Sequence, residues 1–195
     1  MSLGSSGYEA RRSPEKIQET PPKLGPVRFE FDPLLTAALR EEIIGLWLDV
    51  SNTGGAVGFV APVTVADIEP TANAAFARLD SGEDRLLLGF ADDKLVAMLI
   101  FVRGFKLTEH WRTIKRVMVH PGTQGKGYGA ELMREGERVA RECGWEGLFL
   151  TVRGGLGLER FYSALGYKEV GRLPGTLRVA PGDDRDEILM WLALS

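Results

Sequence analysis

A strand, a glycine-rich loop and a helix follow one another between Val117 and Met133, and this succession limits the folds open to the chain. A β-branched segment ends in a turn at Pro121 and Gly122, and an amphipathic helix opens after alternating glycines, at positions 125, 127 and 129. Glycines leave the backbone unobstructed where the first N–H groups of the helix have no intrahelical partner. Such donors, at the positive end of the helix dipole, bind anions, most often phosphate. The segment therefore predicts a β-α unit with a site for a phosphate-bearing cofactor.

The composition fits a globular protein with one domain. A chain of 195 residues can bury a substantial core, and its 44% hydrophobic and 26% charged residues are ordinary proportions. The formal net charge of −3 gives no general attraction to nucleic acid or to an acidic membrane surface. No apolar run approaches the roughly 20 residues that span a bilayer, and the N-terminus lacks the apolar segment of a signal peptide. We expect a cytoplasmic protein with no nucleic-acid or membrane partner.

The single cysteine, Cys143, excludes an internal disulfide and a multi-cysteine zinc site, and it fits a reducing compartment. Its position on the apolar side of the helix after the glycines predicts that it packs against the core. Residues 1–25 are rich in Gly, Ser, Pro, Lys and Glu, which predicts a disordered tail, and the first few are typical of a cloning remnant. Residues 26–195 are expected to form the single domain.

The first part of this domain predicts one strand and two helices. Apolar and polar residues alternate over 27–31, as in a half-buried strand. Asp32, followed by a proline, is typical of a helix cap, and the helix is expected to end in the glycine-containing segment 51–55. A second helix is expected over 65–79, with a break or kink near Pro70.

The second part alternates strands with helices. A tight turn at Asp92 and Asp93 is expected to join two strands at 85–90 and 95–102, and Gly144 is expected to end the helix that follows the glycines. The other expected elements are strands at 113–119, 148–152, 167–172 and 187–194, a short helix at 156–165, and a solvated turn at 183–187. The order β-α-α-β-β-β-α-β-α-β-β predicts a mixed α/β sheet with one central β-α-β unit.

Three phosphate-binding motifs compete for the glycine run. A P-loop requires Gly-Lys followed by Ser or Thr, but Gly127 is followed by Tyr128, which excludes it. A dinucleotide-binding fingerprint is formally matched by Gly125, Gly127 and Ala130. That motif requires a direct turn from strand to helix and an acidic residue after the next strand, where this chain has Arg153. The remaining candidate is a loop that binds acyl-CoA.

The run Val119–Gly129 resembles motif A of the Gcn5-related N-acetyltransferases (GNAT), whose core is [QR]-x-x-G-x-[GA], here Gln124, Gly127 and Gly129. The segment 158–171 is similar to motif B of the same family, in which F-Y-x-x-x-G-[FY] ends the last helix. The resemblance implies the GNAT-type acyl-CoA N-acyltransferase fold. This is an α/β (α+β) domain with a mixed central sheet of six to seven strands and about four helices.

Within this family the chain is similar to the tabtoxin-resistance acetyltransferases at three segments, Gly54–Gly58, His110–Trp111 and Arg178–Met190. The family resemblance implies acetyl-CoA as co-substrate, with no metal. The acceptor is then the primary amine of a small molecule, which attacks directly in a ternary complex. Two alternatives remain open, a non-catalytic acyl-CoA-binding sensor and a protein N-acetyltransferase. A homodimer also remains open, because dimers are common on this fold.

The resemblance also implies which residues bind the cofactor. The backbone N–H groups of the glycine loop would carry the pyrophosphate, and the backbone of the preceding, splayed strand would face the pantetheine arm and the thioester oxygen. Lys126 would add Coulomb attraction, or would simply be a solvated loop lysine. The predicted cofactor-binding residues are Met118, Val119, Gln124, Gly125, Lys126, Gly127, Tyr128 and Gly129.

Tyr162 matches the motif B tyrosine that serves as general acid in many relatives, with packing beside Phe161 as the alternative role. An alkylammonium must lose a proton before it attacks, and a carboxylate or imidazole can relay it. Glu109 and His110, just before the strand that leads to the cofactor loop, are the predicted bases. His120 is a weaker candidate, and water alone could carry the proton.

The acceptor side is less defined by the sequence. Asp49, Ser51 and Asn52 are candidates for binding a cationic amine, with helix-end capping as the alternative. Arg153 is a candidate for a substrate carboxylate or for a salt bridge to the C-terminal acids. Among the tryptophans, Trp111 is the expected pocket residue.

Overall fold

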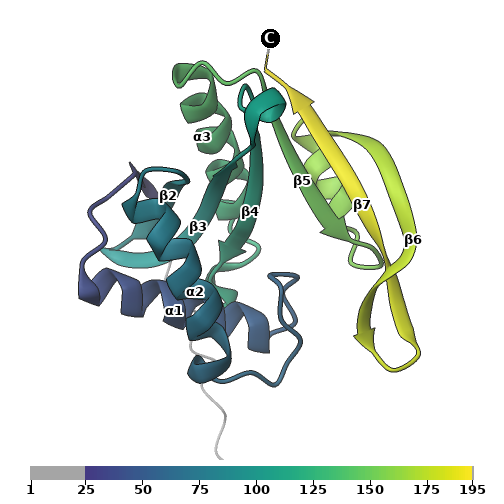
Figure 1. Ribbon diagram of the computed structural model, residues 1–195. Helices are drawn as coiled ribbons and strands as arrows, with labels where there is room; N and C mark the ends of the chain where they lie inside the picture. Colours follow the sequence, from purple (N-terminus) through teal and green to yellow (C-terminus); the bar gives the residue numbers. More distant parts are fainter. Residues whose placement is uncertain (1–24, 195) are drawn as a thin grey trace, which may run out of the picture.

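A computed structural model describes residues 25–194, so the predicted disordered tail lies, except for Gly25, outside the described residues. The elements follow the predicted order (Figure 1). They are β1 (Arg28–Phe31), α1 (Ala37–Asn52), α2 (Val65–Asp80), β2 (Arg85–Ala91), β3 (Lys94–Arg103), η1 (Lys106–Thr108), β4 (Arg112–Val119), η2 (Pro121–Thr123), α3 (Tyr128–Glu142), β5 (Gly147–Arg153), α4 (Leu158–Ala164), β6 (Lys168–Ala180) and β7 (Asp183–Ala193). The predicted fold class, a mixed α/β sheet with about four helices, is confirmed.

The seven strands form one sheet in the order β1-β2-β3-β4-β5-β7-β6. Neighbouring strands are antiparallel except β4 and β5, which are parallel. These two pair only at their beginnings, where Arg112 lies opposite Leu148 and Thr113 opposite Phe149. Beyond this point the strands diverge, and Figure 1 shows the resulting V-shaped separation. The predicted splay next to the cofactor loop is therefore present, and it opens the middle of the sheet.

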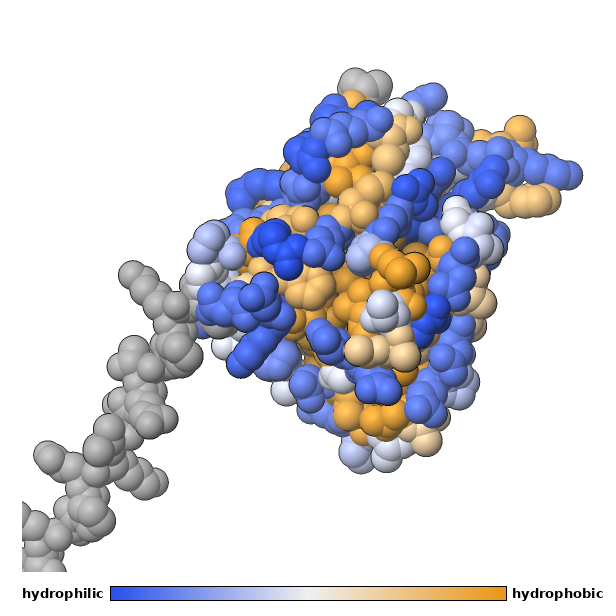
Figure 2. All heavy atoms as spheres, turned by 90° about the vertical axis from the view of Figure 1, so that its left-hand side faces the viewer, coloured by the Kyte–Doolittle hydropathy of each residue, from blue (hydrophilic) through white to orange (hydrophobic). Residues whose placement is uncertain are grey.

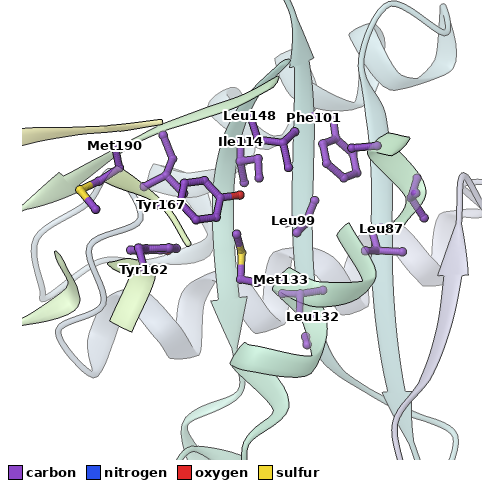
Figure 3. Close-up of a cluster of buried hydrophobic side chains, with 14 of the residues drawn as sticks. Leu87, Leu99, Phe101, Ile114, Leu132, Met133, Leu148, Tyr162, Tyr167 and Met190 are labelled. Atoms are coloured by element: carbon purple, nitrogen blue, oxygen red, sulfur yellow. The ribbon is translucent and has the colours of Figure 1, made fainter. Parts of the chain in front are cut away.

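Each face of the sheet carries its own hydrophobic core. Alternate residues of β3 supply both, because successive side chains of a strand point to opposite faces. On one face, α3 and α4 bury Met133, Tyr162 and other side chains against Leu99 of β3, as Figure 3 shows. On the other face, α1 and α2 bury Trp47 and their other apolar residues against Met98. The sheet is thus the middle layer of three.

The beginning of α1 differs from the prediction. The N-cap is Thr36, whose hydroxyl accepts a hydrogen bond from the Leu39 N–H, rather than Asp32. Asp32 adopts a left-handed backbone conformation (φ 49°), and its carboxylate accepts a hydrogen bond from the Leu86 N–H, so it fastens the end of β1 to β2. Of the expected break or kink near Pro70, the break is absent, because α2 runs through this residue.

The C-terminal hairpin is longer than predicted, and the solvated turn expected at 183–187 is wrong. These residues belong to β7, and the chain turns at 181–182 instead. Arginines on β6 compensate the acidic run across the strand pair. Arg178 binds Asp184 at 2.7 Å, and Arg172 binds Asp186 at 3.1 Å. Charge pairing between neighbouring strands therefore makes a run of acids compatible with sheet.

Cys143 is exposed, so its predicted packing against the core is wrong. The residue is the C-cap of α3, one position beyond the last helical residue, and the apolar face of the helix ends earlier, at Ala140. Gly144 follows in a left-handed conformation (φ 70°), and the Trp145 N–H donates back to the Ala140 carbonyl. Gly144 therefore ends the helix, as predicted.

None of the helices within residues 25–194 is long and apolar enough to cross a bilayer. Figure 2 shows the side of the molecule that lies to the left in Figure 1, and its hydrophobic surface is interrupted by charged and polar side chains.

Candidate active site

A cavity of about 800 Å³ opens where β4 and β5 diverge. It is bounded by both strands, by the glycine loop with the start of α3, by α4, and by the loop that follows α1. Its lining residues are Val50, Gly55, Ala56, Val57, Ile114, Lys115, Arg116, Val117, Val119, Thr123, Gln124, Gly125, Gly127, Tyr128, Gly129, Ala130, Leu150, Thr151, Leu158, Phe161 and Tyr162. A space of this size accommodates a drug-sized ligand or the acyl end of a larger one.

The glycine loop presents free donors to this cavity. Gly125 (φ 79°) and Gly127 (φ 91°) adopt left-handed conformations that side chains disfavour. Within the described residues, the backbone N–H groups of Gly125, Gly127, Tyr128 and Gly129 have no hydrogen-bond acceptor. Gln124 stabilises the loop, because its side-chain amide donates to the Val119 carbonyl at 3.3 Å. Free N–H groups at the start of a helix such as α3 are the geometry that binds anions in other proteins.

Other predicted cofactor residues lie in or beside this loop. Val119, at the end of β4, lines the cavity. Met118 points its side chain into the α1–α2 core, where it is 1% exposed, so only its backbone is available to a ligand. Lys126 is exposed in the glycine loop. The tip of the loop is tethered through Tyr128, whose hydroxyl donates to the Gly25 carbonyl at 2.9 Å.

Tyr162 lies on α4 and lines the cavity together with Phe161. Its ring packs between Phe161 and Tyr167, with ring centroids 5.0 and 5.8 Å away. Figure 3 shows Tyr162 beside Tyr167, near Met133. Burial raises the pKa of the Tyr162 hydroxyl well above its usual value. The hydroxyl is therefore neutral at physiological pH and can act as a proton donor.

Tyr167 is the neighbour of Tyr162 but does not line the cavity. Burial also raises the pKa of its hydroxyl. Among the described residues this hydroxyl has no hydrogen-bond partner. The two tyrosines thus share an environment and differ in their access to the cavity.

The predicted bases lie away from the cavity. Glu109 is an exposed residue that pairs with Arg103 at 3.0 Å, and His110 accepts a backbone hydrogen bond from Glu146 through its carbonyl. Both precede β4, at the end of the strand opposite the glycine loop, and neither lines the cavity. Tyr162 and the glycine loop are brought together, whereas Glu109 and His110 are not.

His120 and Asp49 form a separate pair beside the loop. The His120 Nδ1 accepts a hydrogen bond from the Gly122 N–H at 3.1 Å, which fixes the turn after β4. Its Nε2 lies 3.6 Å from the Asp49 carboxylate. The geometry gives His120 a structural contact in the turn.

The other acceptor-side candidates also make structural contacts. Asn52 bonds to both the N–H and the carbonyl of Val63, so it closes the loop after α1. Ser51 is fully buried. Arg153 donates to the Gly54 carbonyl at 2.8 Å. Trp111 packs edge-on against Phe149 and Trp191 and does not line the cavity, so its expected pocket position is wrong.

Lys115 and Arg116 are the site residues that sequence reasoning missed. They are the charged residues of the cavity lining, and no Asp, Glu or His of the described chain lines it. The register of β4 against β3 shifts between Met118 and Lys115, and Arg116 has φ 57°. This bulge adds a residue to β4 and changes which side chains face the cavity. Two adjacent cations in the middle of the strand were the available signal, but the bulge was not visible in the sequence.

Comparison with known proteins tests the family resemblance of the two sequence motifs. The acetyltransferase (GNAT) family matches residues 59–167 of this chain. Similar solved structures include ribosomal-protein-alanine N-acetyltransferase from Brucella melitensis, with a TM-score of 0.69 and 19% identity over 86% of this chain and 98% of the relative. Another is yncA from Salmonella typhimurium, solved with its cofactor acetyl-CoA, with a TM-score of 0.69 and 20% identity over 87% and 94%. A third is an N-acetyltransferase from Staphylococcus aureus, with a TM-score of 0.71 and 12% identity over 88% and 100%.

The family match covers more than half of the chain, and the structural matches extend the same fold over most of it. The chain belongs to the GNAT acetyltransferase family. It is an N-acetyltransferase, as the two sequence motifs predicted.

Proposed function

We propose that this enzyme transfers an acetyl group from acetyl-CoA to the primary amine of a small molecule, by direct attack within a ternary complex. The observation that carries the proposal is the cavity between β4 and β5, which joins the free N–H groups of the glycine loop to the buried hydroxyl of Tyr162. The acetyl-CoA bound by the Salmonella protein of similar fold supports this choice of donor.

The donor set of the glycine loop fits a pyrophosphate. The N–H groups of Gly125, Gly127, Tyr128 and Gly129 are directed by the start of α3, where the helix dipole favours negative charge. Lys126, in the same loop, adds positive charge near the phosphates. Along β4, the backbone of Met118 and Val119 would face the pantetheine arm, because the departure of β5 leaves that edge without a strand partner.

Tyr162 supplies the proton for the leaving group. The amine nitrogen attacks the thioester carbonyl carbon, a C–N bond forms, the C–S bond breaks, and the sulfur takes the hydroxyl proton of Tyr162. A free thiol has a pKa near 8.5, so the thiolate leaves readily and the acid accelerates the step without being indispensable. The proton that the nitrogen loses to water then returns to the tyrosinate, which restores the hydroxyl, and burial favours this neutral form because it raises the pKa of Tyr162.

Water is the proton acceptor that the cavity lining supports, since no carboxylate or imidazole of the described residues lines it. Glu109 and His110 would act only through a water relay that reaches them outside the cavity. Lys115 and Arg116 contribute indirectly, because nearby positive charge lowers the pKa of a bound ammonium group and favours the neutral amine that attacks.

One alternative function differs in the acceptor. A protein N-acetyltransferase is supported by the ribosomal-protein-alanine N-acetyltransferase among the similar structures. A non-catalytic acyl-CoA sensor, which needs only the glycine loop, is the alternative that membership of the acetyltransferase family argues against. The closer placement beside the tabtoxin-resistance acetyltransferases rests on three sequence segments and stays a prediction.

Thiol release from acetyl-CoA, measured against a library of amines, tests the proposal. The wild type is compared with Tyr162→Phe and with the matched control Tyr167→Phe, which alters a neighbouring buried hydroxyl outside the cavity. We expect Tyr162→Phe to lower kcat about 100-fold with unchanged CoA affinity, and Tyr167→Phe to stay within about twofold of the wild type. CoA binding without turnover of any amine would favour the sensor, and absence of CoA binding would overturn the proposed donor.

A further inference from the structure

We call the part of the cavity that lies on the side of the α1–α2 core its acceptor side. This part carries two positive charges, from Lys115 and Arg116. Lys115 pairs in register with Ile100, which belongs to the α1–α2 core, and partner residues of an antiparallel pair point to the same face. Arg116 stacks over Trp47 of the same core, with its guanidinium carbon 4.7 Å from the ring centroid. Tyr162 belongs to the opposite core. The two cations and the proposed acid therefore reach the cavity from opposite faces of the sheet.

The fold makes room for the Arg116 guanidinium beside the loop after α1. Gly58 (φ 98°) lies so close that a Cβ at this position would come within 2.8 Å of the Arg116 Nη1. The side chain is half-buried, and within the described residues the guanidinium makes no hydrogen bond or ion pair. Other arginines that approach the core differ in this respect. Arg78, for example, is paired with Asp84.

A guanidinium that lines a cavity without a hydrogen bond or ion pair raises the free energy of the folded state, unless a ligand binds it. It has five N–H donors in a planar fork, and loss of water around it costs free energy that an anion can restore. A carboxylate matches the fork with two parallel hydrogen bonds. Because no acidic residue of the described chain lines the cavity, the matching anion has to come from a ligand.

We infer that Arg116 binds a carboxylate of the acceptor, with Lys115 adding positive charge. The inference rests on the proposed function and narrows its substrate class to amino carboxylates, small molecules that carry both a primary amine and a carboxylate. Polycationic acceptors, such as polyamines and aminoglycosides, do not fit a cavity with two cations and no acidic lining residue. The same positive charge that binds the carboxylate keeps the amine from holding its proton.

Matched acceptors test this assignment. A panel of L-amino acids is compared with the corresponding carboxamides and decarboxylated amines at saturating acetyl-CoA, and kcat/KM is expressed per unprotonated amine. We expect the wild type to prefer the acids by about 10- to 100-fold, the size of a charge-assisted hydrogen-bond pair. Arg116→Met is expected to abolish this preference through a higher KM for the acids, and Arg116→Lys to restore part of it.

Arg112→Met is the matched control. Arg112 lies on the same strand and also stacks over a tryptophan, Trp145, at 4.4 Å, but it donates to the carbonyls of Glu109 and Trp111 and does not line the cavity. It is expected to leave the preference for acids unchanged. A loss of preference in both variants would mean that the stacking, and not the cavity cation, is responsible, and this would overturn the inference.

Two further outcomes would overturn it independently of folding, and a third would overturn the proposed function on which it rests. The wild type could acetylate carboxamides as well as acids, which would leave the proposed function intact. Arg116→Met could weaken CoA binding instead of acceptor binding, which would assign the guanidinium to a phosphate of the donor. If no amine is acetylated at all, the proposed function fails. Calorimetric titration of the acids into the CoA complex then decides the inference, which requires that the wild type bind them and Arg116→Met not.

Discussion

The proposed donor side and acceptor side of the cavity would recognise their ligands by different means. On the donor side, the glycine loop offers backbone N–H groups whose direction is set by Gly125, Gly127 and the start of α3. On the acceptor side, the side chains of Lys115 and Arg116 depend on a bulge in β4 and on packing against α1. Backbone recognition requires a local conformation, whereas side-chain recognition requires that distant elements be held in place.

The attachment of α2 to the sheet therefore should matter more to the acceptor side than to the donor side. Asp84 is 4% exposed and accepts two hydrogen bonds from Arg78 of α2, at 2.6 and 2.8 Å, and one from the Arg103 N–H. Asp84→Ala is expected to lower the free energy of unfolding by about 2 kcal/mol, because it removes the buried carboxylate that accepts hydrogen bonds from Arg78 and from the Arg103 N–H. Urea denaturation measures this loss.

Glu83→Ala is the control for this substitution. Glu83 binds the same arginine at 2.9 Å, but it is about half exposed, and an exposed pair contributes less than about 1 kcal/mol. Asp84→Ala is also expected to raise KM for the acceptor more than KM for CoA. An equal rise of both KM values would contradict the contrast between the two sides of the cavity. That result would mean that the donor loop also depends on the α1–α2 layer.

The sequence pointed to more residues of the cavity lining on the proposed donor side than on the acceptor side. Gln124, Gly127 and Gly129 form a local pattern, and Tyr162 stands at a fixed spacing within a second pattern, so neither required knowledge of the fold. Arg116 could not be recognised, because its orientation follows from a bulge and from Gly58, which is distant in the sequence. The expected roles of Cys143 and Trp111 failed for a related reason, since a pattern gives spacing along an element but not where that element ends or which partner covers it.

The pH dependence of catalysis tests the proposed proton donor and proton acceptor, which are Tyr162 for the leaving group and water for the amine. With no protein base in the cavity lining, kcat/KM should rise about tenfold per pH unit below the pKa of the acceptor amine. Burial raises the pKa of Tyr162 above its ordinary 10.0, so this acid keeps its proton as the pH rises, and activity should not fall before about pH 10. A pH–rate profile measures both limbs.

Tyr162→Phe should keep the rising limb, because that limb belongs to the acceptor. A falling limb between pH 7 and 9 in the wild type that disappears in Tyr162→Phe would contradict the burial of the hydroxyl in the working complex. A base on the acceptor side would instead appear as a rising limb with the same midpoint for amines of different pKa.

The smallest effect is expected on the donor side, where a glycine at each end of α3 allows a matched comparison. Gly127 (φ 91°) and Gly144 (φ 70°) are both left-handed, and an added Cβ would meet nothing closer than 3.9 Å at either position. Alanine should therefore cost about 1 kcal/mol of stability at both, through backbone conformation alone. Only Gly127→Ala should also weaken CoA binding, by up to about tenfold, because a change of φ redirects the loop N–H groups. Calorimetry measures the CoA affinity of both variants. Equal affinities would mean that the direction of these N–H groups does not determine donor binding. The contrast between a donor side formed by backbone groups and an acceptor side formed by side chains would then be lost.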